Sequence, residues 1–171
     1  MSRRTLIYLL LFLIQAALWN YFNFSQFLTI VFLPAMIFCL PVSYGTVRTM
    51  VVAFLTGLAL DFIVTGQLGL TSFALVPVAL LRRPVIRFNF GAEIFARGEE
   101  LSFRRQGWQK FVPSLFLLTA VFLLLYIWVD NAGMHPFWFC AVKFAASLAA
   151  SGSVSVWIAF LMLEETGERW K

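Results

Sequence analysis

Hydrophobic positions along the chain gather into six apolar segments that are separated by short polar breaks. The segments cover residues 5–21, 27–42, 49–64, 68–81, 111–129 and 137–163. A helix needs about 20 residues to cross about 30 Å of hydrocarbon, with a usual range of about 17 to 25. The pattern therefore predicts an all-helical membrane protein with six transmembrane spans, of which the second, third and fourth are short.

Glycine and proline mark where these spans begin and end. Gly45, Gly66 and Gly69 interrupt the apolar sequence between residues 42 and 70, which favours three separate spans over one long hydrophobic rod. Pro77 lies inside the fourth segment. Because proline removes a helical hydrogen bond, this position predicts a kink or a partly re-entrant element.

Composition supports lipid as the solvent for most of the molecule. Apolar residues make up 61% of the chain and charged residues 12%, against about 45 to 50% and about 25% in soluble domains. These values exclude a soluble domain, a disordered tail and a nucleic-acid module. Cys39 and Cys140 both lie inside apolar runs, where a thiol behaves as a small hydrophobe and gives no sign of a disulfide scaffold.

Basic residues are confined to alternate breaks. They precede the first span, separate the second from the third, fill the loop 82–110 and follow the sixth span, whereas residues 20–26, 65–67 and 130–136 contain no Lys or Arg. Basic residues accumulate in cytoplasmic loops. We therefore expect both termini to be cytoplasmic, a single transmembrane domain over 1–171, and an N-terminal helix retained as a signal anchor.

The loop 82–110 combines these cations with aromatic and aliphatic residues. Such a segment suits contact with anionic lipid at the cytoplasmic leaflet, and it equally suits an ordinary topogenic loop or a docking site for a partner. The cations that carry these alternatives are Arg82, Arg83, Arg87, Arg104, Arg105 and Lys110.

Two charges fall inside predicted spans. Asp61 lies near the outer end of the third span and Lys143 near the outer part of the sixth, at depths where an unpaired charge is costly. Their shared depth predicts an ion pair or one polar cavity. The alternative is that Lys143 snorkels to the interface while Asp61 caps a helix end.

The sixth span carries small residues at every fourth position. Ala141, Ala145, Ala149 and Ser153 form one row, which lets another helix approach closely. The partner helix could belong to this chain or to another protein. A second row, Ser147, Ser151 and Ser155, lies beside the first.

Candidate catalytic chemistry is nearly absent from the sequence. His135 is the one histidine, so neither a Cys/His metal site nor a conventional triad can be assembled. We expect a protein that is not an enzyme and that binds no cofactor or metal.

The turn between the third and fourth spans resembles a known family. Gly57, Asp61, Gly66 and Gly69 reproduce the G-x-x-x-D-x-x-x-x-G-x-x-G spacing of MreD, the rod shape-determining membrane protein of bacteria. The resemblance implies a non-enzymatic scaffold of the peptidoglycan elongation machinery in the bacterial inner membrane. It also implies MreC-like protein, MreB, and the RodA glycosyltransferase with its penicillin-binding transpeptidase as partners. From physics alone, Gly57 is expected to allow close packing, Asp61 to be a polar anchor, and the other two glycines to form the turn.

MreD-like proteins in turn resemble the substrate-binding S components of ECF vitamin transporters, which are six-helix bundles. This resemblance supplies an alternative function, a ligand site beneath the outer loops, to which Asp61, Asn131, His135, Trp138 and Lys143 could contribute. The small-residue row that S components carry on their first span is reduced here to Ala16 and Ala17. The third hypothesis is that the protein is a membrane scaffold of an unrelated complex.

Overall fold

The computed structural model describes residues 3–21, 28–66, 68–91, 108–131 and 137–167. This part of the chain is all-helical, as the apolar pattern predicts. Its helices are α1 (Arg3–Tyr21), α2 (Leu33–Phe38), α3 (Thr46–Leu60), α4 (Leu70–Phe90), α7 (Trp108–Asn131) and α8 (Phe137–Gly167). A π-helical turn, η1 (Asp61–Thr65), continues α3 toward α4.

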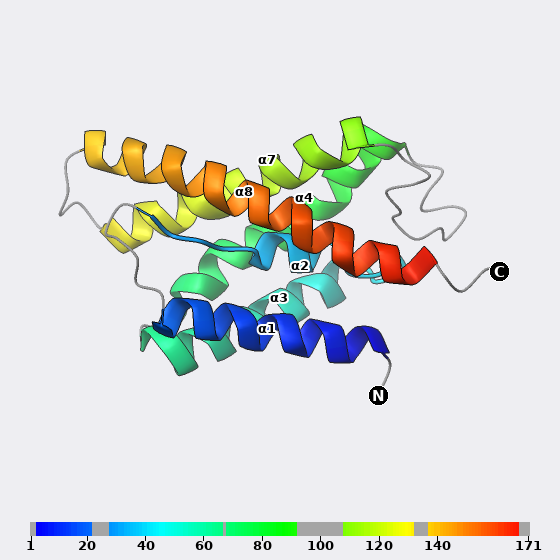
Figure 1. The fold of residues 1–171 in the computed structure, drawn as a ribbon, viewed down its shortest axis with the longest axis horizontal. Helices are drawn as coiled ribbons and strands as arrows, with labels where there is room; N and C mark the ends of the chain where they lie inside the picture. The colour runs from blue at the N-terminus through cyan, green and yellow to red at the C-terminus, as the bar shows by residue number, and fades with distance from the viewer. Residues whose placement is uncertain (1–2, 22–27, 67, 92–107, 132–136, 168–171) are drawn as a thin grey trace.

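The helices form an elongated bundle in which the contacting pairs α3 and α4, α4 and α7, and α7 and α8 run in opposite directions (Figure 1). At one end, α1 and α7 finish, α8 begins, and η1 turns into α4; we call this the Asp61 end. At the other end, α1, α3 and α7 begin while α4 and α8 finish; we call this the Arg87 end. Both ends of the described chain therefore lie on the same side of the bundle.

The core of the bundle is apolar and rich in aromatic rings. Its largest fully buried side chains include Phe32, Phe38, Phe111 and Phe122. The Phe38 and Phe111 rings meet edge to face with centroids 5.0 Å apart, a favoured arrangement for aromatic pairs. This contact fixes α2 against the start of α7.

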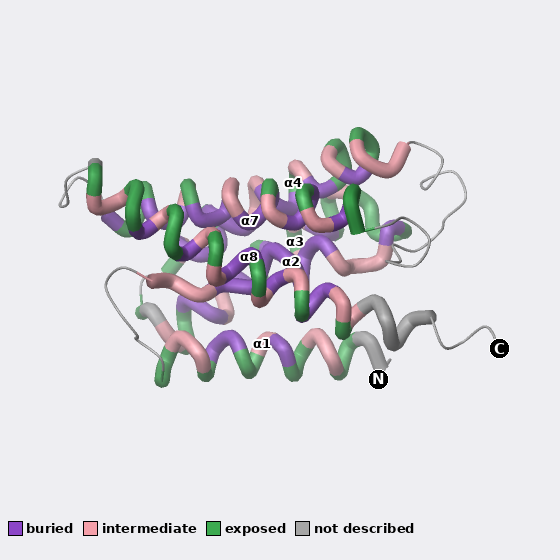
Figure 2. The backbone as a smooth tube through the Cα atoms, turned by 45° about the horizontal axis from the view of Figure 1, so that its top comes forward, coloured by how far each residue is buried: buried purple, intermediate pink, exposed green. Residues whose placement is uncertain are grey.

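Many large apolar side chains are exposed, and Figure 2 shows that exposed positions recur along the helices of the bundle. Exposed apolar side chains in this number fit contact with lipid. Among the described residues, three helical stretches are long and apolar enough to cross a membrane, and the apolar stretch of α1, Thr5–Tyr21, is shorter. Exposed side chains include Leu6, Leu10 and Leu13 of α1, Val51 and Leu55 of α3, Phe73 and Leu80 of α4, and Leu117 and Leu124 of α7.

The prediction of a continuous spanning helix over residues 27–42 is wrong. Residues 29–32 are not helical, α2 has only six residues, and a turn follows before α3. Pro34 occupies the first turn of α2, where proline is tolerated, and Pro41 stops its continuation. The short helix is completely buried, so the segment crosses the bundle interior without facing lipid.

The fourth apolar segment forms a longer helix than predicted. The helix α4 continues through Pro77 and Pro84 to Phe90, and its 21 residues extend for about 31 Å. Arg82, Arg83 and Arg87 are therefore helical rather than part of a loop. Lys110 likewise belongs to the first turn of α7.

Candidate functional site

The carboxylate of Asp61 binds the N-terminus of α4. It accepts hydrogen bonds from the backbone N–H groups of Gly69 at 2.9 Å, Thr71 at 3.1 Å and Ser72 at 3.4 Å. Asp61 is 0% exposed. The first N–H groups of a helix have no partner within the helix and carry partial positive charge, so a buried carboxylate is stabilised there. Asp61 thus anchors α4 to the end of α3.

The three glycines of the motif surround this carboxylate for different reasons. A Cβ on Gly57 would lie 2.6 Å from the Ser72 Cα, so only glycine lets α3 approach α4 this closely. Gly66 (φ 63°) ends η1 and Gly69 (φ 102°) precedes α4, both in the left-handed region that favours glycine. The close packing, the polar anchor and the two turn positions expected from the sequence therefore meet in one unit, the Asp61 turn (Gly57, Asp61, Gly66 and Gly69).

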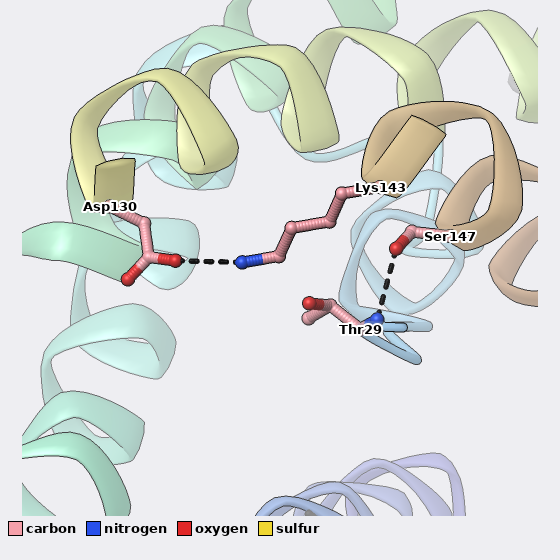
Figure 3. Close-up of polar contacts among 4 residues, drawn as sticks. All are labelled: Thr29, Asp130, Lys143 and Ser147. Atoms are coloured by element: carbon pink, nitrogen blue, oxygen red, sulfur yellow. Dashed lines mark hydrogen bonds and ion pairs between the residues drawn. The ribbon is translucent and has the colours of Figure 1, made fainter. Parts of the chain in front are cut away.

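Lys143 forms an ion pair with Asp130, not with Asp61. Its Nζ lies 3.0 Å from the Asp130 Oδ2, joining the start of α8 to the end of α7 (Figure 3). The lysine side chain is 11% exposed and the aspartate side chain 33%. The predicted Asp61–Lys143 pair is wrong because the carboxylate of Asp61 is held by the α4 N-terminus, while α7 extends far enough to bring Asp130 to Lys143.

One row of serines on α8 hydrogen-bonds to the backbone of segment 28–32. The Ser147 hydroxyl accepts from the Thr29 N–H at 2.9 Å, as Figure 3 shows. One turn later, the Ser151 hydroxyl accepts from the Val31 N–H and donates to the Thr29 carbonyl, both at 3.0 Å. Backbone groups in an apolar interior need partners, and these serines supply them from one side of segment 28–32.

Helix α1 supplies partners from the other side. The Gln15 amide, which is 0% exposed, accepts from the Phe32 N–H at 3.0 Å and donates to the Ile30 carbonyl at 3.3 Å. The Trp19 indole N–H also donates to the Ile30 carbonyl, at 2.9 Å. Segment 28–32 is thus held between the first and last helices through side chains.

The small-residue row of α8 faces outward. Ala141, Ala145, Ala149 and Ser153 are all exposed, whereas Ser147, Ser151 and Ser155 are buried. The Ser153 hydroxyl donates to the Ala149 carbonyl of its own helix at 2.9 Å. The serine row therefore faces the interior of the bundle, and the alanine row faces its exterior. The alanine row forms an exposed strip of small side chains along α8.

Arg82 lies inside the bundle rather than on its surface. It is 4% exposed, and its guanidinium donates to the Phe38 carbonyl at 3.1 Å and to the Leu40 carbonyl. These carbonyls end α2, where a cation is favoured by the helix dipole. The expectation that Arg82 belongs to the contact surface of the loop is wrong, and its role is to fasten α2 to α4.

The remaining loop cations divide between described and undescribed parts of the chain. Arg83, Arg87 and Lys110 are exposed at the Arg87 end. Arg104, Arg105 and His135 lie outside the described residues.

Sequence reasoning missed the partners of segment 28–32 and the role of Asp130. Gln15 was the available signal, because an amide inside an apolar helix needs a buried partner. Pro34 and Pro41, which bracket the second apolar run, were a second signal that a long helix could not form there.

The hydrogen-bonded and paired side chains described above join separate segments of the chain. Among the side chains the structure covers, no three His, Cys, Asp or Glu residues gather to hold a metal ion. No family model matches the chain, and neither a curated protein nor a solved structure matches it.

Proposed function

We propose that this protein is an MreD-like scaffold of the peptidoglycan elongation machinery. It would be a non-enzymatic, multi-pass protein of the bacterial cytoplasmic membrane that assembles with an MreC-like protein, MreB, RodA and its transpeptidase. The observation that carries the proposal is the Asp61 turn. Its four residues carry the resemblance, and all four contribute to one structural unit, which supports a meaningful spacing over a chance match.

Assembly would proceed through helix contacts in the bilayer. The exposed row Ala141, Ala145, Ala149 and Ser153 gives α8 a face on which the backbone of a partner helix can approach closely. We propose this row as the contact for a partner's transmembrane helix. The Arg87 end would face the cytoplasm, because the exposed cations Arg48, Arg83, Arg87 and Lys110 lie there.

A ligand-binding S component is supported less well. Asp61 and Lys143, which such a site would use, are engaged with the α4 N-terminus and with Asp130. The outward side of α1 carries bulky residues instead of a small-residue row, as Leu6 (55% exposed) and Leu13 (56% exposed) show.

Co-purification tests the proposed function. A tagged copy would be expressed in the native host, extracted in mild detergent, and its partners identified by mass spectrometry. Recovery of an MreC-like protein or of a RodA and transpeptidase pair supports the scaffold. Recovery of a transporter ATPase and its membrane subunit instead would overturn it and favour ligand binding.

The same experiment can locate the contact. The double substitution Ala145→Leu and Ala149→Leu fills the exposed row with bulk, so partner recovery should fall while the protein level stays constant. The matched control Leu117→Phe and Leu124→Phe adds bulk on the exposed side of α7 and should leave recovery unchanged. Equal recovery from both variants would exclude the α8 row as the contact.

A further inference from the structure

The segment that joins α3 to α4 exposes bulky apolar side chains. Phe62 and Ile63 of η1 are 78% and 60% exposed, and Leu68 in the turn that follows is 67% exposed. Residues 49–81 contain one charged residue, Asp61, and its side chain is buried. Turns that face water are normally polar. The hairpin tip, formed by Phe62, Ile63 and Leu68, instead has the character of a surface that contacts hydrocarbon.

The backbone behind this tip finds its hydrogen-bond partners within the protein. The Asp61 carboxylate accepts from the N–H groups of Gly69, Thr71 and Ser72, and the Gly66 N–H donates to the Asp61 carbonyl at 2.9 Å. A turn in water can leave such groups to the solvent, whereas a turn in hydrocarbon needs an internal partner for each of them. The buried carboxylate is the acceptor that a turn without water requires.

Both limbs of the α3–α4 hairpin are shorter than the hydrocarbon core. At about 1.5 Å per residue, the path from Arg48 to Val64 is about 24 Å, and the path from Arg83 back to Leu70 is about 20 Å. Arg48 and Arg83 are exposed at the Arg87 end, and exposed cations of membrane helices stay at the membrane surface. Measured from that surface, the hairpin ends inside about 30 Å of hydrocarbon.

The helix α7 reaches farther toward the Asp61 end. Its path from Lys110 to Asp130 is about 30 Å, which is the thickness of the hydrocarbon. The Asp130 side chain is one-third exposed, and the exposed Trp128 lies two residues before it, as is typical near a membrane surface. The helix α7 therefore extends from one surface to the other, while the hairpin tip stops short of the second surface.

We propose that the hairpin tip lies within the bilayer leaflet opposite the Arg87 end and contacts acyl chains rather than water. The uncharged sequence around the tip offers a soluble partner no ionic contact, and hydrocarbon matches its exposed side chains. Headgroups can approach the Asp61 turn only where the bilayer thins beside α3 and α4. This inference is independent of the cell-wall role.

Spin-label accessibility in liposomes tests this position. Leu68→Cys and Ile63→Cys would each be labelled with a nitroxide in the full-length protein, after Cys39 and Cys140 have been replaced by alanine. The liposomes would contain phosphatidylethanolamine and phosphatidylglycerol. Power saturation then compares collisions with oxygen, which concentrates in hydrocarbon, and with a water-soluble nickel chelate.

Two labelled positions provide matched controls. Leu117→Cys, at an exposed position within α7, reports hydrocarbon. Gly45→Cys lies in the turn before α3 at the Arg87 end, where an added Cβ meets nothing within 4 Å, and reports water. The ratio of oxygen to nickel collisions at both tip positions should match that of Leu117→Cys and exceed that of Gly45→Cys severalfold.

Two results would overturn the proposal. A ratio at the tip equal to that of Gly45→Cys would place the tip in water. Protection of the tip from both reagents would show that a second copy of the protein covers it. The unfolding transition of each labelled variant, compared with that of the unlabelled protein, shows that the native fold is being measured. Two tip positions keep the test decisive if one variant fails to fold.

Discussion

The chain leaves the α-helical conformation at the Asp61 turn and at segment 28–32, and side chains bind the free backbone groups of these two interruptions in different ways. At the Asp61 turn, one carboxylate accepts from three N–H groups at the start of the next helix. At segment 28–32, neutral side chains from the first and last helices bind N–H and carbonyl groups one or two at a time. The turn is local and charged, whereas the segment is assembled from distant parts of the chain and is neutral.

The difference implies a different distribution of stability. Hydrogen bonds to a charged group are roughly twice as strong as neutral ones, so the turn concentrates its stabilisation in Asp61. Segment 28–32 distributes its stabilisation over Gln15, Trp19, Ser147 and Ser151, each of which should contribute less. Four substitutions test this ranking, each measured as the free energy of unfolding in a mixed-micelle SDS titration.

Asp61→Leu should cause the largest loss, about 3 to 5 kcal/mol, because buried N–H groups of α4 lose their acceptor. Asp61→Asn keeps one acceptor oxygen and should lose about half as much. Asp130→Asn is the matched control, since its carboxylate is one-third exposed and its ion pair is weakened by solvent. Equal losses at Asp61 and Asp130 would contradict the special role of the turn.

Gly57→Ala should cost about 1 to 3 kcal/mol, because the new methyl group meets the Ser72 backbone at 2.6 Å and α3 must move away from α4. Gly45→Ala provides the control, since a Cβ there meets nothing within 4 Å. If the two alanine variants unfolded alike, the close approach of the helices would not be needed.

Gln15→Leu should cost about 1 to 2 kcal/mol, because the Phe32 N–H is left buried without an acceptor. The Ile30 carbonyl keeps its bond from Trp19, which limits the loss. Leu13→Ala, on the exposed side of α1, should change stability much less. A loss at Gln15 as large as that at Asp61 would remove the contrast between the two interruptions.

Ser151→Ala should also cost about 1 to 2 kcal/mol, because the buried Val31 N–H loses its acceptor, as the Phe32 N–H does in Gln15→Leu. Two other serines of α8 sharpen the test. Ser153→Ala removes an exposed bond within the helix, and Ser155→Ala removes a buried hydroxyl that has no partner, so neither should destabilise the protein. Three equal losses would show that serine acts through helix propensity rather than through segment 28–32.

The Asp61 turn could be predicted from sequence because all its parts lie within residues 57–72. Glycine at fixed spacing marks left-handed and close-packed positions, and an acidic residue before a helix start marks an anchor. The pairing of Lys143 was missed because Asp130 was assigned to a loop, although α7 extends to Asn131. The expected depth of Lys143 in the membrane was compatible with an ion pair to either Asp61 or Asp130.

Segment 28–32 could not be predicted in the same way. An apolar run such as Ile30–Phe32 is compatible with a buried strand or a helix, and periodicity does not separate the two. Its partners Ser147 and Ser151 lie more than 100 residues away along the chain, so no local pattern reports the contact. In sequence, the serine row is indistinguishable from a helix-packing surface, because serine is also one of the small residues found where membrane helices contact one another.

The position of segment 28–32 between α1 and α8 also constrains how the protein is made. A ribosome delivers this segment to the membrane long before it delivers Ser147 and Ser151, which later bind the Thr29 and Val31 N–H groups. Until the last helix inserts, those groups have no serine partner. The N-terminal half therefore completes its set of hydrogen bonds only when synthesis has reached α8, and a chain that stops before α8 leaves the Thr29 and Val31 N–H groups without these acceptors.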